Sequence, residues 1–335
     1  MPRGALGRAS RTLWVVVVPV ALACLALRYL VPVTGTGPRG TVAALGHRYV
    51  LLSGLGLYFV FSGIARYWYP SPATGARAAR RGRELLVAAA MVASAVLVAL
   101  AFRAYVGRPY RVLSASMLPT LEPDDLVGGR VRPYVSTPPM RGDVVVFRGA
   151  AVPGAPGLPE TLVKRVIGLP GDRISMRGSV PVVNGWAVPS CDVGEYLHVL
   201  PEPGEEGTHG RLRVEFLDDR AYLTVYSMGV PSVTDYAVQP GEVFVLGDSR
   251  SNSSDSRSYN KGFGGGVPVG AIDARARWFL VGTRPDGNLD LGRLFQPIDR
   301  PRASVRLEGV QPQSIADGIA RCLRDRPKDT RPPPP

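Results

Sequence analysis

The sequence predicts a mainly β, barrel-like domain that is anchored to a membrane by three transmembrane helices. Two observations lead to this fold class. Long uncharged stretches are confined to the beginning of the chain, whereas short β-type runs between Gly and Pro turns start near residue 110. We therefore expect an N-terminal membrane region over residues 1–108, a β-rich domain over residues 109–299 and a basic Pro-rich tail over residues 300–335.

Three apolar stretches in the N-terminal region have the properties of membrane spans. They lie near residues 12–33, 49–65 and 85–102, and the third carries no charge over a length close to the about 20 residues that cross a bilayer. The second is short, but the aromatic residues 67–69 that follow it are typical of a membrane interface. For the first stretch the alternative is a cleaved signal peptide, and the two later stretches argue against it.

The arginines predict the orientation of these spans. They are frequent before the first span and between the second and the third, and basic residues favour the cytoplasmic side. Three spans then leave the N-terminus in the cytoplasm and the β-rich domain on the extracytoplasmic side of the plasma (inner) membrane. Loss of the second span would place either the N-terminus or the β-rich domain on the opposite side of the membrane.

Short runs of β-forming residues define the domain that follows. They cover residues 143–147, 162–167, 211–216, 221–226 and 242–246. No long amphipathic helix interrupts them, so we predict an all-β domain. We interpret residues 202–210 as a polar excursion and residues 260–266 as a flexible glycine-rich loop. In the tail we expect a short helix over residues 314–323 and disorder at the last residues.

Charge and cysteine content exclude several classes of protein. The net charge is +13 at pH 7, but nearly all basic residues are arginines spread without dense runs, which argues against nucleic-acid binding. Cys24, Cys191 and Cys322 are too few and too scattered for a zinc site or a disulfide framework, and they leave open one Cys191–Cys322 bridge. No metal and no cofactor is implied.

Residues 114–120, Ser-Ala-Ser-Met-Leu-Pro-Thr, predict a turn after the last apolar stretch. Proline cannot donate to a sheet ladder, and serine favours turns. Ser116 is our candidate nucleophile, and a serine nucleophile needs a base. A triad with His47, His198 or His209 finds no supporting motif.

Lys164 is the better candidate base. It interrupts the apolar run of residues 162–167, where β alternation puts it on the same face as Leu162 and Val166. An ordinary lysine is neutral in only about one molecule in 2,500 at pH 7, but burial can lower its pKa by roughly 3–5 units. Arginine cannot be deprotonated in this way. On periodicity alone, a surface lysine with apolar neighbours stays open as the alternative.

A polar loop after the run 242–246 completes the candidate site. Residues 247–257 read Gly-Asp-Ser-Arg-Ser-Asn-Ser-Ser-Asp-Ser-Arg, and such residues also form ordinary solvated loops. As part of a site, Asp255 and Arg257 can form a charge-assisted pair, and Ser253 can hydrogen bond near the lysine.

Together these segments resemble type I signal peptidase. The matching motifs are Ser-Ala-Ser-Met-Leu-Pro-Thr-Leu (114–121), Arg-Gly-Asp-Val-Val-Val-Phe (141–147), Lys-Arg-Val-Ile-Gly-Leu-Pro-Gly-Asp (164–172) and the 247–257 loop, in that order. The resemblance implies a serine-lysine dyad in which Ser116 attacks and Lys164 is the general base. It also implies that Ser114 and the Ser116 N–H form the oxyanion hole. Ser249 departs from the Asn that is common in the family.

The resemblance assigns further roles around the dyad. Ser253 would orient the Lys164 amine, and Asp255 and Arg257 would brace the site. Apolar side chains would line the pockets for the small residues of Ala-X-Ala-like cleavage sites. These side chains are Val112, Leu121 and Val163.

The implied function is that of a membrane-bound serine endopeptidase that cleaves N-terminal signal peptides from exported preproteins. Its partners would be those peptides and the lipid bilayer, with no nucleic acid; the sequence does not indicate an oligomeric state. Two alternatives stay open. One is a maturation protease of the same family dedicated to a single precursor, and the other is a catalytically silent, membrane-bound β binding module.

Overall fold

The computed structural model describes residues 108–131, 133–135, 137–198, 208–227, 235–282, 290–301 and 312–335. The chain divides into two compact units, Met1–Ala104 and Tyr105–Pro335, and the first lies wholly outside the described residues. The spans that we predict near residues 12–33, 49–65 and 85–102 lie outside them as well. In the described part of the second unit, no helix is both long and apolar enough for a membrane span.

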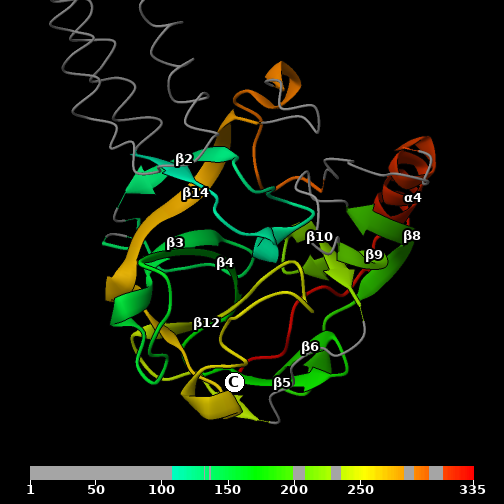
Figure 1. Ribbon diagram of the computed structural model, residues 1–335. Helices are drawn as coiled ribbons and strands as arrows, with labels where there is room; N and C mark the ends of the chain where they lie inside the picture. Colours follow the sequence, from blue (N-terminus) through cyan, green and yellow to red (C-terminus); the bar gives the residue numbers. More distant parts are fainter. Residues whose placement is uncertain are drawn as a thin grey trace, which may run out of the picture. The chain divides into compact units, whose positions relative to one another are not determined.

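The second unit is mainly β, as predicted. Its described strands form three antiparallel sheets of seven, three and four strands (Figure 1). Each sheet has a linear order among the described strands, and the barrel-like arrangement stays a prediction.

The seven-stranded sheet has the order β1-β2-β14-β3-β4-β12-β13. Its strands are β1 (Arg108–Arg111), β2 (Leu126–Val131), β3 (Val144–Arg148), β4 (Thr161–Gly168), β12 (Glu242–Leu246), β13 (Val267–Pro268) and β14 (Ile272–Val281). The central strands β3, β4 and β12 are rich in Val, Leu, Ile and Phe, and they are buried on both faces. The predicted runs 143–147, 162–167 and 242–246 are therefore confirmed.

The second sheet has the order β10-β9-β8. Its strands are β8 (Ser190–His198), β9 (Thr208–Leu217) and β10 (Arg220–Tyr226), which confirms the predicted runs 211–216 and 221–226. Residues 201–207 lie outside the described residues. The polar excursion that we placed at 202–210 is corrected at its end, because residues 208–210 already pair with β8.

The third sheet has the order β11-β5-β6-β7. Its strands are β5 (Arg173–Arg177), β6 (Val180–Val183), β7 (Trp186–Ala187) and β11 (Tyr236–Ala237). Its side chains pack on those of β12 and β10 in one buried cluster that includes Ile174, Val183, Phe244 and Tyr222. The glycine-rich segment 260–266 lies outside the sheets and contains a short 3-10 turn, η3 (Asn260–Gly262).

Helix α4 (Pro312–Arg324) confirms the helix that we predicted over residues 314–323. Its apolar side packs on the second sheet, where Ile315 and Ile319 join a buried cluster with Tyr196 of β8. A disulfide joins Cys322 of α4 to Cys191 of β8, with their Cα atoms 5.6 Å apart. The bridge that the cysteine positions left open is therefore formed.

The last residues are ordered, contrary to our expectation. Thr330 exchanges two hydrogen bonds with Asp218, as its carbonyl accepts from the Asp218 N–H and its hydroxyl donates to the Asp218 carbonyl. Asn184 Nδ2 donates to the carbonyl of Pro333 over 2.8 Å. The chain thus runs from α4 to a position beside β5 (Figure 1). Prolines have little conformational freedom to lose, and the disulfide places the start of this segment, so its ordering is favourable.

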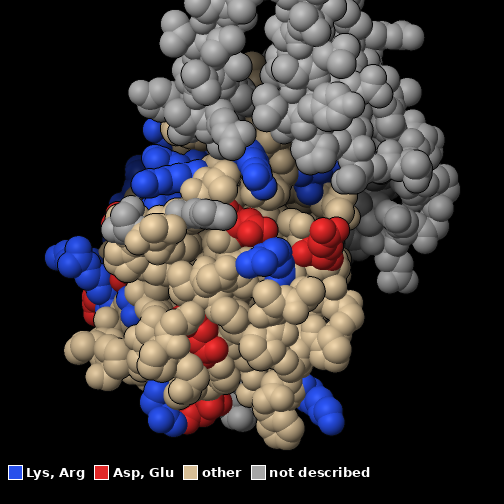
Figure 2. All heavy atoms as spheres, turned by 90° about the vertical axis from the view of Figure 1, so that its left-hand side faces the viewer, with Lys and Arg blue, Asp and Glu red and all other residues tan. Residues whose placement is uncertain are grey.

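The described surface carries charges of both signs. Figure 2 shows acidic and basic side chains scattered over a mostly uncharged face. Several arginines are paired with aspartates at the surface, including Arg173 with Asp235 and Arg211 with Asp192. Such exposed pairs add little to stability, but they offset part of the positive charge of the chain.

Candidate active site

Ser116 lies in a short 3-10 turn, η1 (Ala115–Met117), between β1 and β2. The predicted turn over residues 114–120 is confirmed, and its Leu118–Pro119 peptide bond is cis. Ser116 is 8% exposed. Its carbonyl oxygen accepts a hydrogen bond from the Ser249 N–H over 3.1 Å, which attaches the turn to the loop after β12.

Lys164 projects from β4 to the Ser116 hydroxyl. Its Nζ lies 2.5 Å from Ser116 Oγ, although the two residues are 48 positions apart in the chain. Lys164 is only 3% exposed, as predicted from its apolar neighbours. Burial lowers its pKa to about 8, although the carboxylates of Asp255 and Asp248 act in the opposite direction. With that pKa, about a tenth of the molecules carry a neutral amine at pH 7.

Ser114 stands on the solvent side of the same turn. Its Oγ lies 3.1 Å from Ser116 Oγ, and its backbone is extended, with φ of −141°. Ser114 is exposed, so its hydroxyl is accessible to a bound peptide. This position allows Ser114 to donate a hydrogen bond toward a carbonyl that Ser116 attacks.

The 247–257 loop brings Asp255 and Arg257 together beside the dyad, as predicted. Arg257 Nε and Nη2 donate to the two carboxylate oxygens of Asp255, each over 2.8 Å, and both side chains are buried. Burial alone would raise the pKa of Asp255, but the hydrogen bonds and charge of Arg257 lower it. Asp255 also accepts a hydrogen bond from the Gly247 N–H over 2.9 Å, which joins the first residue of the loop to the Asp255–Arg257 pair.

Ser253 packs against Gly247. A Cβ on Gly247 would lie 2.3 Å from Ser253 Oγ, so glycine is required there. In the described part of the chain no hydrogen bond joins Ser253 to Lys164. The orientation of the amine by Ser253 therefore stays a prediction.

The apolar residues that we predicted as pocket residues lie together. Val112, Leu121 and Val163 belong to one buried cluster that also contains Met117 of the nucleophile turn. Met117 directly follows Ser116 in η1, whereas Val163 precedes Lys164 on β4 and so points to the opposite face of that strand. That these side chains receive a substrate stays a prediction.

Sequence reasoning missed a second layer of buried charge. Arg165 Nε and Nη2 donate to Asp248 over 2.7 and 2.6 Å, and Thr120 donates to the same carboxylate over 2.5 Å. A further buried pair joins Arg250 to Glu215. The available signal was a charged residue with apolar neighbours on both sides, as at Glu215 between Val214 and Phe216. Among the described residues, no group of His, Cys, Asp and Glu is arranged to hold a metal ion.

Comparison with known proteins identifies the family of this chain. The family model described as "Signal peptidase, peptidase S26" matches residues 85–281, which is more than half of the chain. The chain belongs to this signal peptidase family. The resemblance to bacterial type I signal peptidase, which the four motifs indicate, is thereby confirmed.

Individual signal peptidases match over much of the chain. Signal peptidase I of Bacillus caldolyticus is 35% identical over 49% of this chain and 77% of its own length. Signal peptidase I of Pseudomonas aeruginosa is 31% identical over 60% of this chain and 67% of its own length. A crystal structure of a signal peptidase I from Enterococcus faecalis V583 covers 41% of this chain and 95% of its own, at 21% identity and a TM-score of 0.22, which is too low to support an argument.

Proposed function

We propose that this chain is a membrane-bound serine endopeptidase that removes N-terminal signal peptides from exported preproteins. The observation that carries the proposal is the 2.5 Å contact between Lys164 Nζ and Ser116 Oγ at a buried lysine. A buried amine with a lowered pKa can take the proton of a hydroxyl that would otherwise be a poor nucleophile. The family to which the chain belongs supports the same reaction.

The proposed reaction begins with transfer of the Ser116 proton to the neutral Lys164 amine. Ser116 Oγ attacks the scissile carbonyl, and the oxyanion is stabilised by the Ser114 hydroxyl and the Ser116 N–H. The C–N bond then breaks as Lys164 returns the proton to the leaving amine, which leaves an acyl-enzyme on Ser116. Lys164 next takes a proton from water as the water attacks the acyl carbonyl. The bond between that carbonyl and Ser116 Oγ then breaks, Lys164 returns the proton to Oγ, and the signal peptide is released.

Cleavage after Ala-X-Ala-like sites is the specificity that we propose. Val112, Leu121 and Val163 share a buried cluster with Met117, which directly follows Ser116, and we expect short side chains of a bound peptide to contact them. The disulfide between Cys191 and Cys322 supports an extracytoplasmic position, because disulfides persist in oxidising compartments. Anchoring by the N-terminal spans would hold enzyme and precursor at the same membrane.

Three variants test the dyad on an Ala-X-Ala precursor: Ser116→Ala, Lys164→Ala and Lys164→Arg. We expect each to abolish cleavage while the chain remains folded in the membrane. Lys164→Arg decides the role of the lysine, because arginine keeps the positive charge and cannot accept the proton. Substantial activity of that variant would overturn the assignment of the base.

Two other functions give different results. A dedicated maturation protease of the same family would cleave one precursor and leave a panel of unrelated Ala-X-Ala precursors intact. A catalytically silent β module would show no cleavage, and an acylating inhibitor would not label Ser116. The short Lys164–Ser116 contact favours the peptidase over the silent module.

A further inference from the structure

Residues 247–250, here called the support loop, hold the backbone of the proposed nucleophile. The Ser249 N–H donates to the Ser116 carbonyl over 3.1 Å. A Cβ on Gly247 would lie 2.5 Å from that same oxygen. A displacement of this loop would therefore move Ser116 relative to Lys164.

The second sheet holds the support loop through the backbone of β10. The Val225 N–H donates to the Asp248 carbonyl over 3.0 Å, and the Arg250 N–H donates to the Val225 carbonyl over 2.9 Å. Val225 and Ser249 thus form a parallel bridge. The loop behaves as a short extra strand at the edge of the second sheet.

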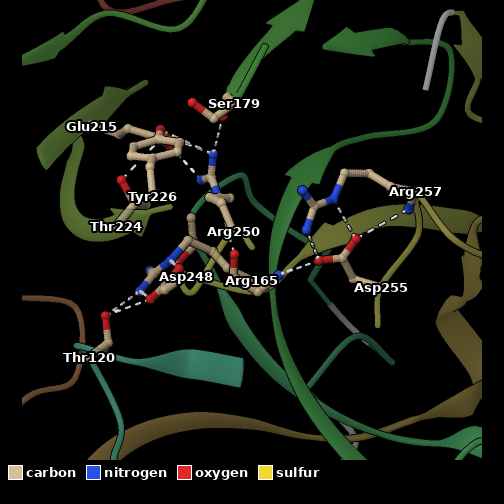
Figure 3. A network of polar contacts seen from close by, with 12 residues as sticks. Thr120, Arg165, Ser179, Glu215, Thr224, Tyr226, Asp248, Arg250, Asp255 and Arg257 are labelled. Carbon is tan, nitrogen blue, oxygen red and sulfur yellow. Dashed lines mark hydrogen bonds and ion pairs between the residues drawn. The ribbon is translucent and has the colours of Figure 1, made fainter. Parts of the chain in front are cut away.

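A buried ion pair connects the same two parts through side chains (Figure 3). Arg250 Nη1 and Nη2 donate to the two carboxylate oxygens of Glu215 over 2.8 and 2.6 Å. Both side chains are 0% exposed. Arg250 Nε donates to the Gly247 carbonyl over 3.1 Å, so one guanidinium joins β9 to the first residue of the support loop.

Strand β10 fixes the Glu215 carboxylate in turn. The Tyr226 hydroxyl donates to Glu215 Oε1, and Thr224 Oγ1 approaches the same oxygen to 3.4 Å. Glu215 stands between the buried apolar residues Val214 and Phe216, where a carboxylate is costly unless it is fully paired. Apolar side chains would fill this space without such a cost. Unlike a two-point ion pair, however, they would not fix the orientation of the support loop relative to β9.

We propose that Glu215 is a positioning residue for the peptidase reaction, which acts through Arg250 to set the support loop and with it the Ser116–Lys164 contact. The inference rests on the proposed function, since it assumes that Ser116 and Lys164 carry the chemistry. It gives the second sheet a part in catalysis although Glu215 does not touch the dyad.

Glu215→Gln in the full chain tests the inference. The amide keeps the shape of the carboxylate but presents an NH₂ group to one of the Arg250 donors. We expect kcat to fall about tenfold or more with KM changed less than about twofold, because the substrate contacts remain and only the alignment of the dyad is lost. Glu215→Asp, which keeps the charge, should restore part of kcat.

The pH profile separates positioning from a general loss of stability. A displaced loop admits water to Lys164, so the apparent pKa of kcat/KM should rise in Glu215→Gln toward that of an ordinary lysine. The charged groups around Lys164 are Asp255, Asp248 and Arg257, and the variant keeps all three side chains. Asp248 belongs to the support loop, but Arg165 and Thr120 also hold its carboxylate. A lower melting temperature with unchanged kcat and unchanged pH profile would overturn the inference.

Asp172→Asn is the matched control. Asp172 is also a buried carboxylate in a two-point pair with an arginine, Arg141, and it contacts no residue of the support loop. We expect it to lower the melting temperature and to leave the pH profile in place. An equal shift of the profile in Asp172→Asn would also count against a specific role of Glu215.

Two further variants keep the outcome decisive. If Glu215→Gln does not fold, Tyr226→Phe removes only the hydroxyl that binds Glu215, and it should lower kcat in the same direction by a smaller factor, about threefold. No change in kcat of folded Tyr226→Phe would then overturn the inference. Ser116→Ala is measured in parallel: if it stays active, the proposed function fails, whereas inactive Ser116→Ala with normal Glu215 variants rejects the positioning role alone.

Discussion

Lys164 determines how the proposed reaction depends on pH. Its pKa is lowered to about 8 by burial, and only the neutral amine can accept the Ser116 proton. We expect kcat/KM for an Ala-X-Ala precursor to increase about tenfold per pH unit below pH 8 and to level off above it. A profile that stays flat from about pH 6 to about pH 9 would contradict the role of Lys164 as base.

The same lowered pKa predicts the sign of a stability effect. The folded chain binds the Lys164 proton more weakly than the unfolded chain, in which the pKa is 10.5, so the cost of burial is fully present below pH 8 and disappears as the pH rises to 10.5. Lys164→Met should therefore raise the free energy of unfolding by roughly 3 kcal/mol at neutral pH, since each unit of pKa shift corresponds to about 1.4 kcal/mol. Denaturant unfolding of the purified chain measures this. A gain that is the same at pH 7 and pH 10.5 would contradict the explanation.

Gly247 is the residue at which the site has least space. An alanine Cβ would lie 2.3 Å from Ser253 Oγ and 2.5 Å from the Ser116 carbonyl, so the nucleophile or its support must move. We expect Gly247→Ala to lower kcat about a hundredfold, the usual order for a displacement of about 1 Å at reacting groups. Gly270→Ala is the control, because a Cβ there meets no atom within 4 Å. Equal effects of the two substitutions on cleavage would refute this.

The contact between Ser116 and Lys164 could be predicted because each residue contradicts its local surroundings. Ser116 lies three residues before a proline in a turn, and Lys164 interrupts an apolar strand in a chain that mostly uses arginine. Glu215 carries a similar signal, but its partner Arg250 lies between two serines in the loop after β12, and local periodicity contains no information about such pairing. The exposure of Ser114 and the position of Ser253 likewise depend on tertiary contacts.

At the level of elements, the disulfide attaches α4 to the sheet that supports the active site. It closes a loop of 131 residues, and native disulfides commonly contribute about 2–4 kcal/mol. The double variant Cys191→Ser, Cys322→Ser should unfold at a lower denaturant concentration and lose the sensitivity to reductant that the parent chain shows. If reductant destabilises both chains equally, the bridge does not stabilise this unit.

The strands were predictable because β-branched and aromatic runs bounded by turn residues report strands directly. Their division into three sheets was not, since strand order depends on contacts between residues far apart in the chain. The tail shows the same limit. Its composition is typical of disorder, yet hydrogen bonds from Asp218 and Asn184 and the attachment of α4 order it.

At the scale of the whole molecule, the net charge of +13 is a weak guide to function. On the described unit some arginines form buried pairs with carboxylates, such as Arg165 with Asp248 and Arg250 with Glu215, and others lie at the surface on the same face as acidic side chains (Figures 2 and 3). The cysteines are more informative, because a disulfide indicates the compartment in which the domain folds.

The predicted orientation of the chain can be tested with a single thiol. In the variant Cys24→Ser, Cys322→Ser the remaining Cys191 is free, and it is partly exposed on β8. A membrane-impermeant maleimide should label it in intact cells without lysis or reduction, because we place this domain outside the cytoplasm. The variant Cys24→Ser alone should become labelled only after a reductant opens the Cys191–Cys322 bridge. If the single-thiol variant is labelled only after lysis, the domain lies in the cytoplasm. Signal peptides of exported proteins are not removed there, so this result would contradict both the predicted orientation and the proposed function.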